Sequence, residues 1–549
     1  MENQDRKTRM EKLPPELSLD RFATLTELID WSLKTHGDMP GFSCFGKTLS
    51  YADVDRLSSN FAAYLQRETD LVPGDRIAIQ LPNVLQFPIA LYGALRAGLV
   101  VVSTNPLYTE QELEHQFKDS EASAVITLEA FASKVASVLP RTQIRTVIVS
   151  KLGDMQPAPR AFVLNFAAKH IKKLVPAWHI PEAHYFTDCI GAPRKPRVEV
   201  NQSRQDLAVL LYTGGTTGVA KGAMLSHGNL LSNMMQFRAR SVLAMQDRME
   251  NVAAPLPLYH SYAFLMHCFA MPYAGNHNVL IPNPRDIPAL IKALKRYKVS
   301  GFVGINTLYL AIMRHPSFAK LEKGTLKFCG AGGMAMSSSV AEEWLERTSC
   351  EIIEGYGLTE CSPAVTVNLP NAVRPGSVGI AMPETELCTV DESGNRLAEG
   401  ERGELWIRGP QVMAGYWKNP EATAEAITSD GWFKSGDYAE IAADGYVTIV
   451  DRKKDMILVS GFNVFPHEIE NWVDRHPKVL ESAAIAVANE KTGEAVKLFV
   501  VAQEADLQID EVIAHCRSGL AAYKVPKEVV FVSDLPKSII GKVLRRELR

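Results

Sequence analysis

The chain has few cysteines and no arrangement of them that suggests a disulfide framework. Eight cysteines are scattered over 549 residues. Cys329, Cys350 and Cys361 have neither CxxC nor Cys/His metal-binding spacing. We therefore interpret the cysteines as free thiols in a reducing compartment.

The chain also lacks a strong surplus of either charge and a long uninterrupted apolar run. Fifty-nine Lys and Arg oppose 62 Asp and Glu, a formal net charge of −3. This balance gives no reason to expect a nucleic-acid partner. The most apolar long stretch, 87–103, is short for a membrane span and is interrupted by Arg96. The first residues, MENQDRKTRMEK, lack the apolar segment of a signal peptide. We expect a cytoplasmic protein.

Residues 161–178, AFVLNFAAKHIKKLVPAW, are predicted to form an amphipathic helix. A helix lying on the inner face of a membrane would show this pattern. An ordinary surface helix that packs its apolar side on the core fits as well, and we favour it as the commoner case. One side would carry Phe162, Phe166, Ala167, Ile171 and Leu174, and the other Lys169, Lys172 and Lys173.

The chain does show alternating strand-like and helical segments. Predicted buried strands cover 76–81, 100–104, 124–127 and 146–150, and a helix covers 84–96. This alternation is typical of an α/β protein in which helices cover mixed or parallel sheets.

The length predicts more than one domain, because a single core rarely grows this large. The charged connector DRKKD, 451–455, precedes about a hundred residues with their own α and β alternation. We predict a large domain over 1–450, a hinge over 451–455 and a small α+β domain over 456–549.

The segment 207–230, LAVLLYTGGTTGVAKGAMLSHGNL, predicts a phosphate-binding loop. Glycines let backbone N–H groups approach an anion, and Lys221 adds a compact positive charge. It is not a Walker A loop, because Ala220 precedes Lys221 and Gly222 follows it. A Gly/Thr-rich surface turn is the alternative. The predicted loop contains Thr213, Gly214, Gly215, Thr216, Thr217 and Gly218.

The segment 354–363, EGYGLTECSP, carries three further candidates. Tyr356 lies between two glycines, so its ring can lie flat against a base. Thr359 can donate a hydrogen bond to a phosphate, and Glu360 can bind Mg²⁺, which prefers carboxylate and phosphate oxygens. The alternative is a glycine-rich loop with a solvated Glu360.

TGGTTGVAKG resembles the signature loop of the adenylate-forming superfamily, which includes acyl-CoA synthetases, peptide-synthetase adenylation domains and luciferases. The resemblance covers nearly the whole chain and is closest to the long-chain fatty acid–CoA ligases, especially in VSGFNVFPHEIE and PKSIIGKVLRREL. It implies ATP-dependent activation of a fatty acid to acyl-CoA through acyl-AMP, with release of AMP and pyrophosphate. ATP and coenzyme A would be co-substrates and Mg²⁺ the cofactor.

The resemblance also implies roles for individual residues. Asp437 and Arg452 would bind ribose, Thr213 and Glu360 the metal, and His260 would border the carboxylate end of the acyl site. Taken alone, Asp437 would be a turn residue, Arg452 a surface charge and His260 a structural histidine. Adenine and acyl contacts are implied for Ala331, Gly332, Gly333, Glu354 and Gly355, the hinge for Lys454, and the coenzyme A tunnel for Ser460, Gly461 and Phe462.

Lys542 matches the catalytic lysine of the family at P-K-S-x-x-G-K. A carboxylate that attacks an anionic phosphorus is repelled, and a cation placed between them neutralises the charge where it develops. A lysine near a C-terminus is otherwise usually a solvated charge. The family also uses a mobile small domain, and its members are often dimers.

Three alternatives stay open. The acid could be medium-chain or aryl, the acyl group could pass to a carrier protein instead of coenzyme A, or the fold could be a silent lipid-binding protein.

Overall fold

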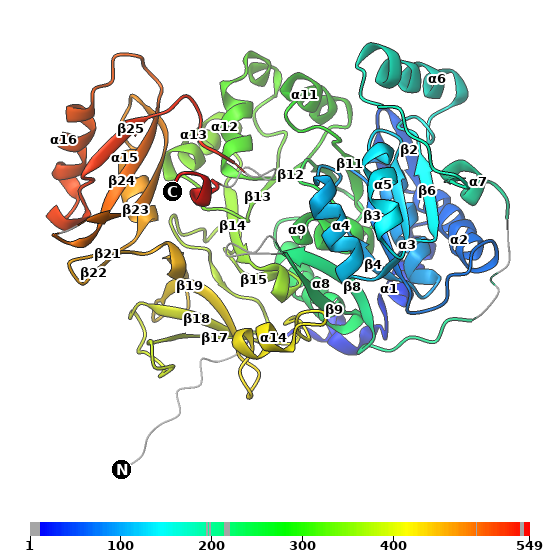
Figure 1. Cartoon of the computed structure of the whole chain (residues 1–549), viewed down its shortest axis with the longest axis horizontal. Coiled ribbons are helices and arrows are strands. Elements are labelled where there is room, and N and C mark those ends of the chain that lie inside the picture. The colour runs from blue at the N-terminus through cyan, green and yellow to red at the C-terminus, as the bar shows by residue number, and fades with distance from the viewer. Residues whose placement is uncertain (1–10, 194–195, 197–198, 214–219, 490, 538–542) are drawn as a thin grey trace.

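The computed structural model describes residues 11–193, 196, 199–213, 220–489, 491–537 and 543–549. The strands of the described chain form four sheets, two of them large, one four-stranded and a separate one five-stranded (Figure 1). Helices cover the large sheets, which confirms the α/β prediction. No helix in the described part of the chain is long and apolar enough to cross a membrane.

The seven-stranded sheet contains every strand predicted from the N-terminal alternation. Its β3, β4, β5, β6 and β8 pair in parallel, and only β9 joins antiparallel. In spatial order the strands are β7 (His184–Tyr185), β6 (Thr146–Ser150), β5 (Ala122–Leu128), β3 (Arg76–Gln80), β4 (Val100–Ser103), β8 (Leu207–Thr213) and β9 (Lys221–Ser226).

The apolar stretch 87–103 is a buried helix followed by a buried strand. Helix α3 (Gln86–Arg96) packs on α2 (Tyr51–Arg67) at Gly93, where a Cβ atom would lie 2.6 Å from the Phe61 ring. Arg96 ends α3 and pairs with Asp30 and Asp55 at 2.5 Å each. The charge that interrupts the apolar run is therefore neutralised at the edge of the core.

The nine-stranded sheet carries the motifs from the middle of the chain. In spatial order its strands are β16 (Ile380–Ala381), β15 (Ala364–Val367), β14 (Ile352–Gly357), β13 (Phe328–Ala331), β12 (Gly301–Gly304), β10 (Asn251–Ala254), β11 (His277–Leu280), β1 (Pro40–Cys44) and β2 (Lys47–Ser50). The helices α1 (Leu25–His36), α8 (His227–Ser241), α11 (Ile287–Arg296), α12 (Asn306–Arg314) and α13 (Ser338–Thr348) pack beside the two large sheets.

The four-stranded sheet contacts the nine-stranded sheet through a short backbone pairing. Val378 N donates to Val447 O, and Val447 N donates to Gly379 O, both at 2.8 Å. This pairing places β19 next to the end of β14, where the site lies. The sheet runs β17 (Glu386–Val390), β18 (Gly403–Arg408), β19 (Phe433–Ile441) and β20 (Val447–Arg452).

The five-stranded sheet lies wholly after the predicted hinge. It has its own core with α15 (Pro466–Val473) and α16 (Ile509–Gly519). Strand β20 ends at Arg452, and a 3₁₀ turn, Lys453–Asp455, leads into this unit. Its strands are β21 (Ile457–Val459), β22 (Phe462–Val464), β23 (Val479–Asn489), β24 (Gly493–Ala502) and β25 (Glu528–Phe531).

The predicted amphipathic helix differs from its expected form. Helix α6 (Ala158–Phe166) continues as one π-helical turn, Ala167–Ile171, so the helix starts earlier and ends sooner than expected. The prediction that its apolar side packs on the core is wrong. Phe162 is 70% exposed and Ile171 66%, because the helix packs on the protein through smaller residues of its other side.

Gly379 should be indispensable at the junction of the two sheets. It has φ +85°, and a Cβ atom there would lie 2.0 Å from the carbonyl carbon of Val367. We expect Gly379→Ala to lower the free energy of unfolding by about 3 kcal/mol or more, from left-handed strain plus overlap. Gly376 has φ +77° but open space, so Gly376→Ala should cost only about 1–2 kcal/mol. Urea unfolding measures both variants, and equal losses would contradict the role of the close approach.

Candidate active site

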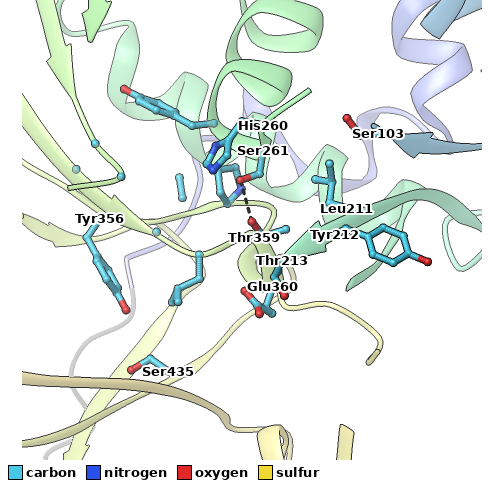
Figure 2. A pocket seen from close by; sticks show the side chains of 18 of the residues that line it. Ser103, Leu211, Tyr212, Thr213, His260, Ser261, Tyr356, Thr359, Glu360 and Ser435 are labelled. Carbon is cyan, nitrogen blue, oxygen red and sulfur yellow. Dashed lines mark hydrogen bonds between the residues drawn. The ribbon is translucent and has the colours of Figure 1, made fainter. Parts of the chain in front are cut away.

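A cavity of about 1140 Å³ lies where the large sheets, the four-stranded sheet and the C-terminal residues meet. Figure 2 shows His260, Thr213, Thr359 and Glu360 around it, although these residues come from distant parts of the chain. The predicted site residues that line the cavity are Thr213, Lys221, His260, Gly332, Gly333, Gly355, Tyr356, Thr359, Glu360, Arg452 and Lys454.

The predicted phosphate loop lies between the antiparallel strands β8 and β9. Thr213 and Lys221 are register partners at its base, and Thr213 Oγ1 donates to Lys221 O at 3.5 Å. Lys221 Nζ lies 5.0 Å from the centre of the Tyr416 ring. Gly214, Gly215, Thr216, Thr217 and Gly218 lie outside the described residues. Strand β9 separates the loop from the helix that begins at His227.

Tyr356, Asp437 and Arg452 form a connected group across two sheets. The Tyr356 hydroxyl donates to Asp437 Oδ2 at 2.5 Å, and Arg452 Nε pairs with Asp437 Oδ1 at 3.1 Å. Asp437 and Arg452 are also register partners of β19 and β20. Burial and the neighbouring Asp437 raise the pKa of Tyr356, so its hydroxyl stays a donor. The group presents a flat ring and a fixed guanidinium to the cavity, with a buried carboxylate behind them.

Glu360 is a carboxylate that lines the cavity, as does Thr213 at the base of the predicted phosphate loop. The Tyr416 hydroxyl donates to its Oε1 at 2.8 Å, and burial raises its pKa. Thr359 Oγ1 lies 3.3 Å from Ser261 Oγ, the dashed contact in Figure 2.

One carboxylate and one hydroxyl fit a magnesium ion that is bound partly by phosphates. Mg²⁺ in nucleotide sites uses one or two carboxylates and takes its other ligands from phosphates and water. Glu360 and Thr213 supply such a partial set at the cavity wall. Among the described residues no three His, Cys, Asp or Glu cluster as metal ligands, which this mode of binding does not require.

Of the residues predicted around adenine and the acyl chain, Gly332, Gly333 and Gly355 line the cavity, whereas Ala331 and Glu354 do not. Gly332 leaves room that a Cβ atom would fill at 3.3 Å from Gly355 O and the Tyr262 ring. Glu354 accepts a hydrogen bond from Met336 N at 3.3 Å, and burial raises its pKa to about 7. Ala331 does not line the cavity, because its side chain packs in the core beneath β13.

His260 precedes α9 (Ser261–Leu265) as its N-cap residue. Its side chain lines the cavity, as Figure 2 shows. Because α9 begins at Ser261, directly after His260, the two residues lie side by side at the cavity.

The small domain brings its C-terminal residues to the cavity. Lys542 lies outside the described residues, but Lys537 and Val543 on either side line the cavity and form a β-bridge. Arg545 Nη2 contacts both carboxylate oxygens of Glu470 at 2.7 Å. Burial opposes ionisation of Glu470, but Arg545 and His467 hold its pKa at about 2. This buried ion pair fixes the segment that follows Lys542.

The predicted coenzyme A residues do not line this cavity. Ser460 and Gly461, at φ +51° and +85°, form the two-residue turn between β21 and β22. Phe462 stacks on Tyr523 with ring centres 4.7 Å apart. Lys454 lines the cavity and precedes this turn along the chain, and burial lowers its pKa.

Sequence reasoning missed Tyr416 and Ser261. Tyr416 lies 56 positions from Glu360, so no local spacing links them. Ser261 follows His260 in PLPLYHSYA, where attention to hydroxyl groups beside the predicted histidine could have found it.

Comparison with models of known protein families shows the family to which the chain belongs. The model of the AMP-binding enzymes matches residues 29–417, and that of the AMP-binding enzyme C-terminal domain matches residues 468–542. The chain belongs to the AMP-binding enzyme family. The two matched regions fall on either side of the 3₁₀ turn that enters the small domain.

Relatives within the AMP-binding enzymes extend along nearly the whole chain. A long-chain-fatty-acid–CoA ligase of Yersinia pestis is 46% identical over 98% of this chain and 96% of its own length. A feruloyl-CoA synthase of Amycolatopsis is 34% identical over 92% of this chain and 94% of its own. The ATP-bound crystal structure of MatB from Rhodopseudomonas palustris is 29% identical, covers 95% of this chain and 98% of its own, and has a TM-score of 0.83.

The Tyr416 hydroxyl should be needed to keep Glu360 ionised. Its hydrogen bond lowers the pKa of Glu360 against the effect of burial, so Tyr416→Phe should raise that pKa. A charge-assisted hydrogen bond contributes about 1.5–3 kcal/mol. We expect kcat/KM for Mg-ATP to fall about tenfold or more, with the acidic limb of the pH profile moved to higher pH. Tyr446→Phe is the matched control, because the Tyr446 hydroxyl donates to Ala372 O away from the cavity. An unchanged pH profile for Tyr416→Phe would contradict the role.

Proposed function

We propose that this protein is an ATP-dependent ligase that joins a long-chain fatty acid to coenzyme A through an acyl-adenylate. The observation that carries the proposal is the convergence of sequence motifs from distant parts of the chain on one cavity. The nearly full-length similarity to a long-chain-fatty-acid–CoA ligase supports the acid and the thiol.

In the first step the fatty carboxylate attacks the α-phosphorus of ATP. A bond forms between carboxylate oxygen and phosphorus, the α–β phosphoanhydride breaks, and pyrophosphate leaves. Tyr356 lies against adenine, with Glu354 and Gly355 at its edge, and Asp437 and Arg452 bind the ribose. Gly214–Gly218 and Lys221 bind the phosphates.

Thr213 and Glu360 would hold Mg²⁺, which when bound neutralises charge on the triphosphate. Lys542 supplies the cation between the attacking carboxylate and the phosphate. The Arg545–Glu470 pair holds the chain just beyond it.

In the second step the coenzyme A thiolate attacks the acyl carbon, and AMP leaves. Ser460, Gly461 and Phe462 form the coenzyme A contact in our proposal. Their position outside the cavity supports a rotation of the small domain about Lys454, which exchanges the C-terminal segment for this turn.

The C-terminal end of α8 and the turn after it support a long apolar acid. Phe237 and Ser241 of α8, and Ala244 in the turn that follows, line the cavity. The opposite apolar wall comes from β13, β14 and the segment after β16. His260 and Gly332 would border the carboxylate end. The opposite wall consists of Phe328, Gly330, Ile353 and Met382.

An aryl acid is the second candidate, because the feruloyl-CoA synthase relative is 34% identical over 92% of this chain. A panel of acids separates the two. The proposal also includes the location and the partners of the protein. It would be a cytoplasmic enzyme that forms a homodimer and touches the inner membrane face peripherally.

Pyrophosphate release with Mg-ATP tests the reaction. Saturated acids from C6 to C18 and ferulic acid are compared with and without coenzyme A. We expect acid-dependent release, turnover that needs coenzyme A, and an acyl-CoA product. Lys542→Ala should slow adenylate formation about 10²–10³-fold, as loss of one transition-state donor does.

Lys527→Ala is the control, since Lys527 is an exposed lysine of the same small domain. Adenylate formation without coenzyme A use would favour transfer to a carrier protein. No release with any acid would contradict the proposed function and favour a silent lipid-binding fold.

The cavity wall formed by the end of α8 and the turn after it should set the acyl chain length. Ala244→Phe adds a ring to the cavity wall, so we expect the preferred acid to become shorter, with kcat/KM for C16 at least tenfold lower and that for C8 little changed. Leu345→Phe, on the exposed side of α13, is the control. Equal losses for C8 and C16 would show that the substitution damages the fold or the nucleotide site.

A further inference from the structure

Exposed apolar side chains concentrate on α6 and the turn that follows it. We call Phe162, Val163, Phe166, Ile171 and Leu174 the α6 patch. No other described stretch of similar length exposes as many large apolar side chains. Water-exposed apolar groups grouped in this way mark a contact surface more often than scattered ones do. Figure 1 shows α6 at the outer edge of the molecule, far from the small domain.

The protein holds α6 so that its patch faces outward. Gly153 N donates to Asn165 Oδ1 at 2.8 Å, and a Cβ atom at Gly153 would lie 2.7 Å from Ala161 O. Ala168 is buried on the same inward side. Because small residues make this close contact, the large apolar side chains lie on the outside. The patch is therefore part of an anchored helix.

Aromatic rings order the patch. The rings of Phe162 and Phe166 stack with centres 6.0 Å apart, and His170 packs 4.9 Å from Phe166. These positions follow one another at i, i+4 and i+8, so they form a stripe along the helix. A stripe of this kind can enter the boundary between lipid headgroups and acyl chains.

The charged residues within the segment that carries the patch are of one sign. Residues 155–181 contain four Lys and Arg and no Asp or Glu, in a chain with net charge −3. Arg160 precedes the patch, and Lys169, Lys172 and Lys173 lie within it. All four side chains are exposed. A basic rim around an apolar stripe complements an anionic lipid surface.

The end of the helix places basic and apolar groups together. Leu174 N donates to Ala168 O at 2.9 Å, and Lys173 adopts φ +51° to close the turn. Leu174 is thereby kept exposed directly after two lysines.

A second copy of the chain fits the patch less well than lipid does. A twofold interface brings the same surface against itself, so the four basic residues would meet their own copies. No acidic residue of 155–181 is present to pair with them. Lipid phosphates supply the missing negative charge.

We propose that the α6 patch docks this protein on an anionic lipid surface. Only the benefit of this docking rests on the proposed function, since a membrane-bound ligase would meet long-chain acids in the membrane into which they partition. The docking helix belongs to the large domain, so binding leaves the small domain free to rotate.

Sedimentation with vesicles tests the docking without ATP, acid or coenzyme A. Vesicles contain phosphatidylcholine alone or with phosphatidylglycerol. We expect wild type to bind the anionic vesicles, and Phe162→Gln/Phe166→Gln/Ile171→Gln to bind at least tenfold more weakly. Lys169→Gln/Lys172→Gln/Lys173→Gln should lose the preference for anionic lipid.

Two control variants match the kind of change. Leu345→Gln/Ile509→Gln replaces exposed apolar residues elsewhere, and Lys491→Gln/Arg517→Gln/Lys527→Gln replaces exposed basic residues of the small domain. Both should bind vesicles as wild type does. Pyrophosphate release from detergent-dispersed acid should be unchanged in the α6 variants, which separates failure of docking from failure of the proposed reaction.

Two results would overturn the proposal. One is equal vesicle binding by wild type and the apolar α6 variant, including no binding by either. The other is a change from dimer to monomer in that variant, measured by light scattering, which would make the patch an interface between copies.

Discussion

The close backbone pairing of Gly379 with Val447 is the constraint on which the site depends. It joins the nine-stranded sheet, which carries Tyr356, to the four-stranded sheet, which carries Asp437. The 2.5 Å contact between Tyr356 and Asp437 crosses this junction, so it exists only while the sheets stay in register, whereas the 3.1 Å contact of Arg452 with Asp437 lies within the four-stranded sheet. A side chain at position 379 would overlap the β15 backbone. The geometry of a nucleotide site thus follows from one position that contributes no functional group.

Burial in and beside the cavity opposes the charged forms of three ionisable groups. Burial raises the pKa of Glu354 and Glu360 and lowers that of Lys454. Shifts in these opposite directions have one cause, the loss of water around each charge. In such surroundings a fixed charge acts more strongly on a substrate charge than it would in water. A triphosphate and a carboxylate are substrates for which this matters, because their mutual repulsion opposes the reaction.

The two functional surfaces that we propose lie on parts of the chain with different freedom. The α6 patch is fixed to the large domain through Gly153 and Asn165, whereas the C-terminal segment belongs to a unit with its own core. The only covalent link to that unit is the segment around Lys453–Asp455. The proposed membrane contact on the large domain would therefore leave the proposed exchange of small-domain surfaces unhindered.

The sequence by itself determined the strands of the parallel sheet, the order of the motifs and the chemistry of each motif, because these depend on local pattern and residue type. Tyr356 and Glu360 were predicted from their own motif, and Arg452 from the resemblance to a known family; all three line the cavity. The tertiary structure decided which groups meet. Tyr416 reaches Glu360 across 56 positions, Ala331 turns into the core, and α6 exposes the apolar side that periodicity assigned to the interior. Helical periodicity identifies an apolar face but carries no information on what covers it, and that depends on packing between distant segments.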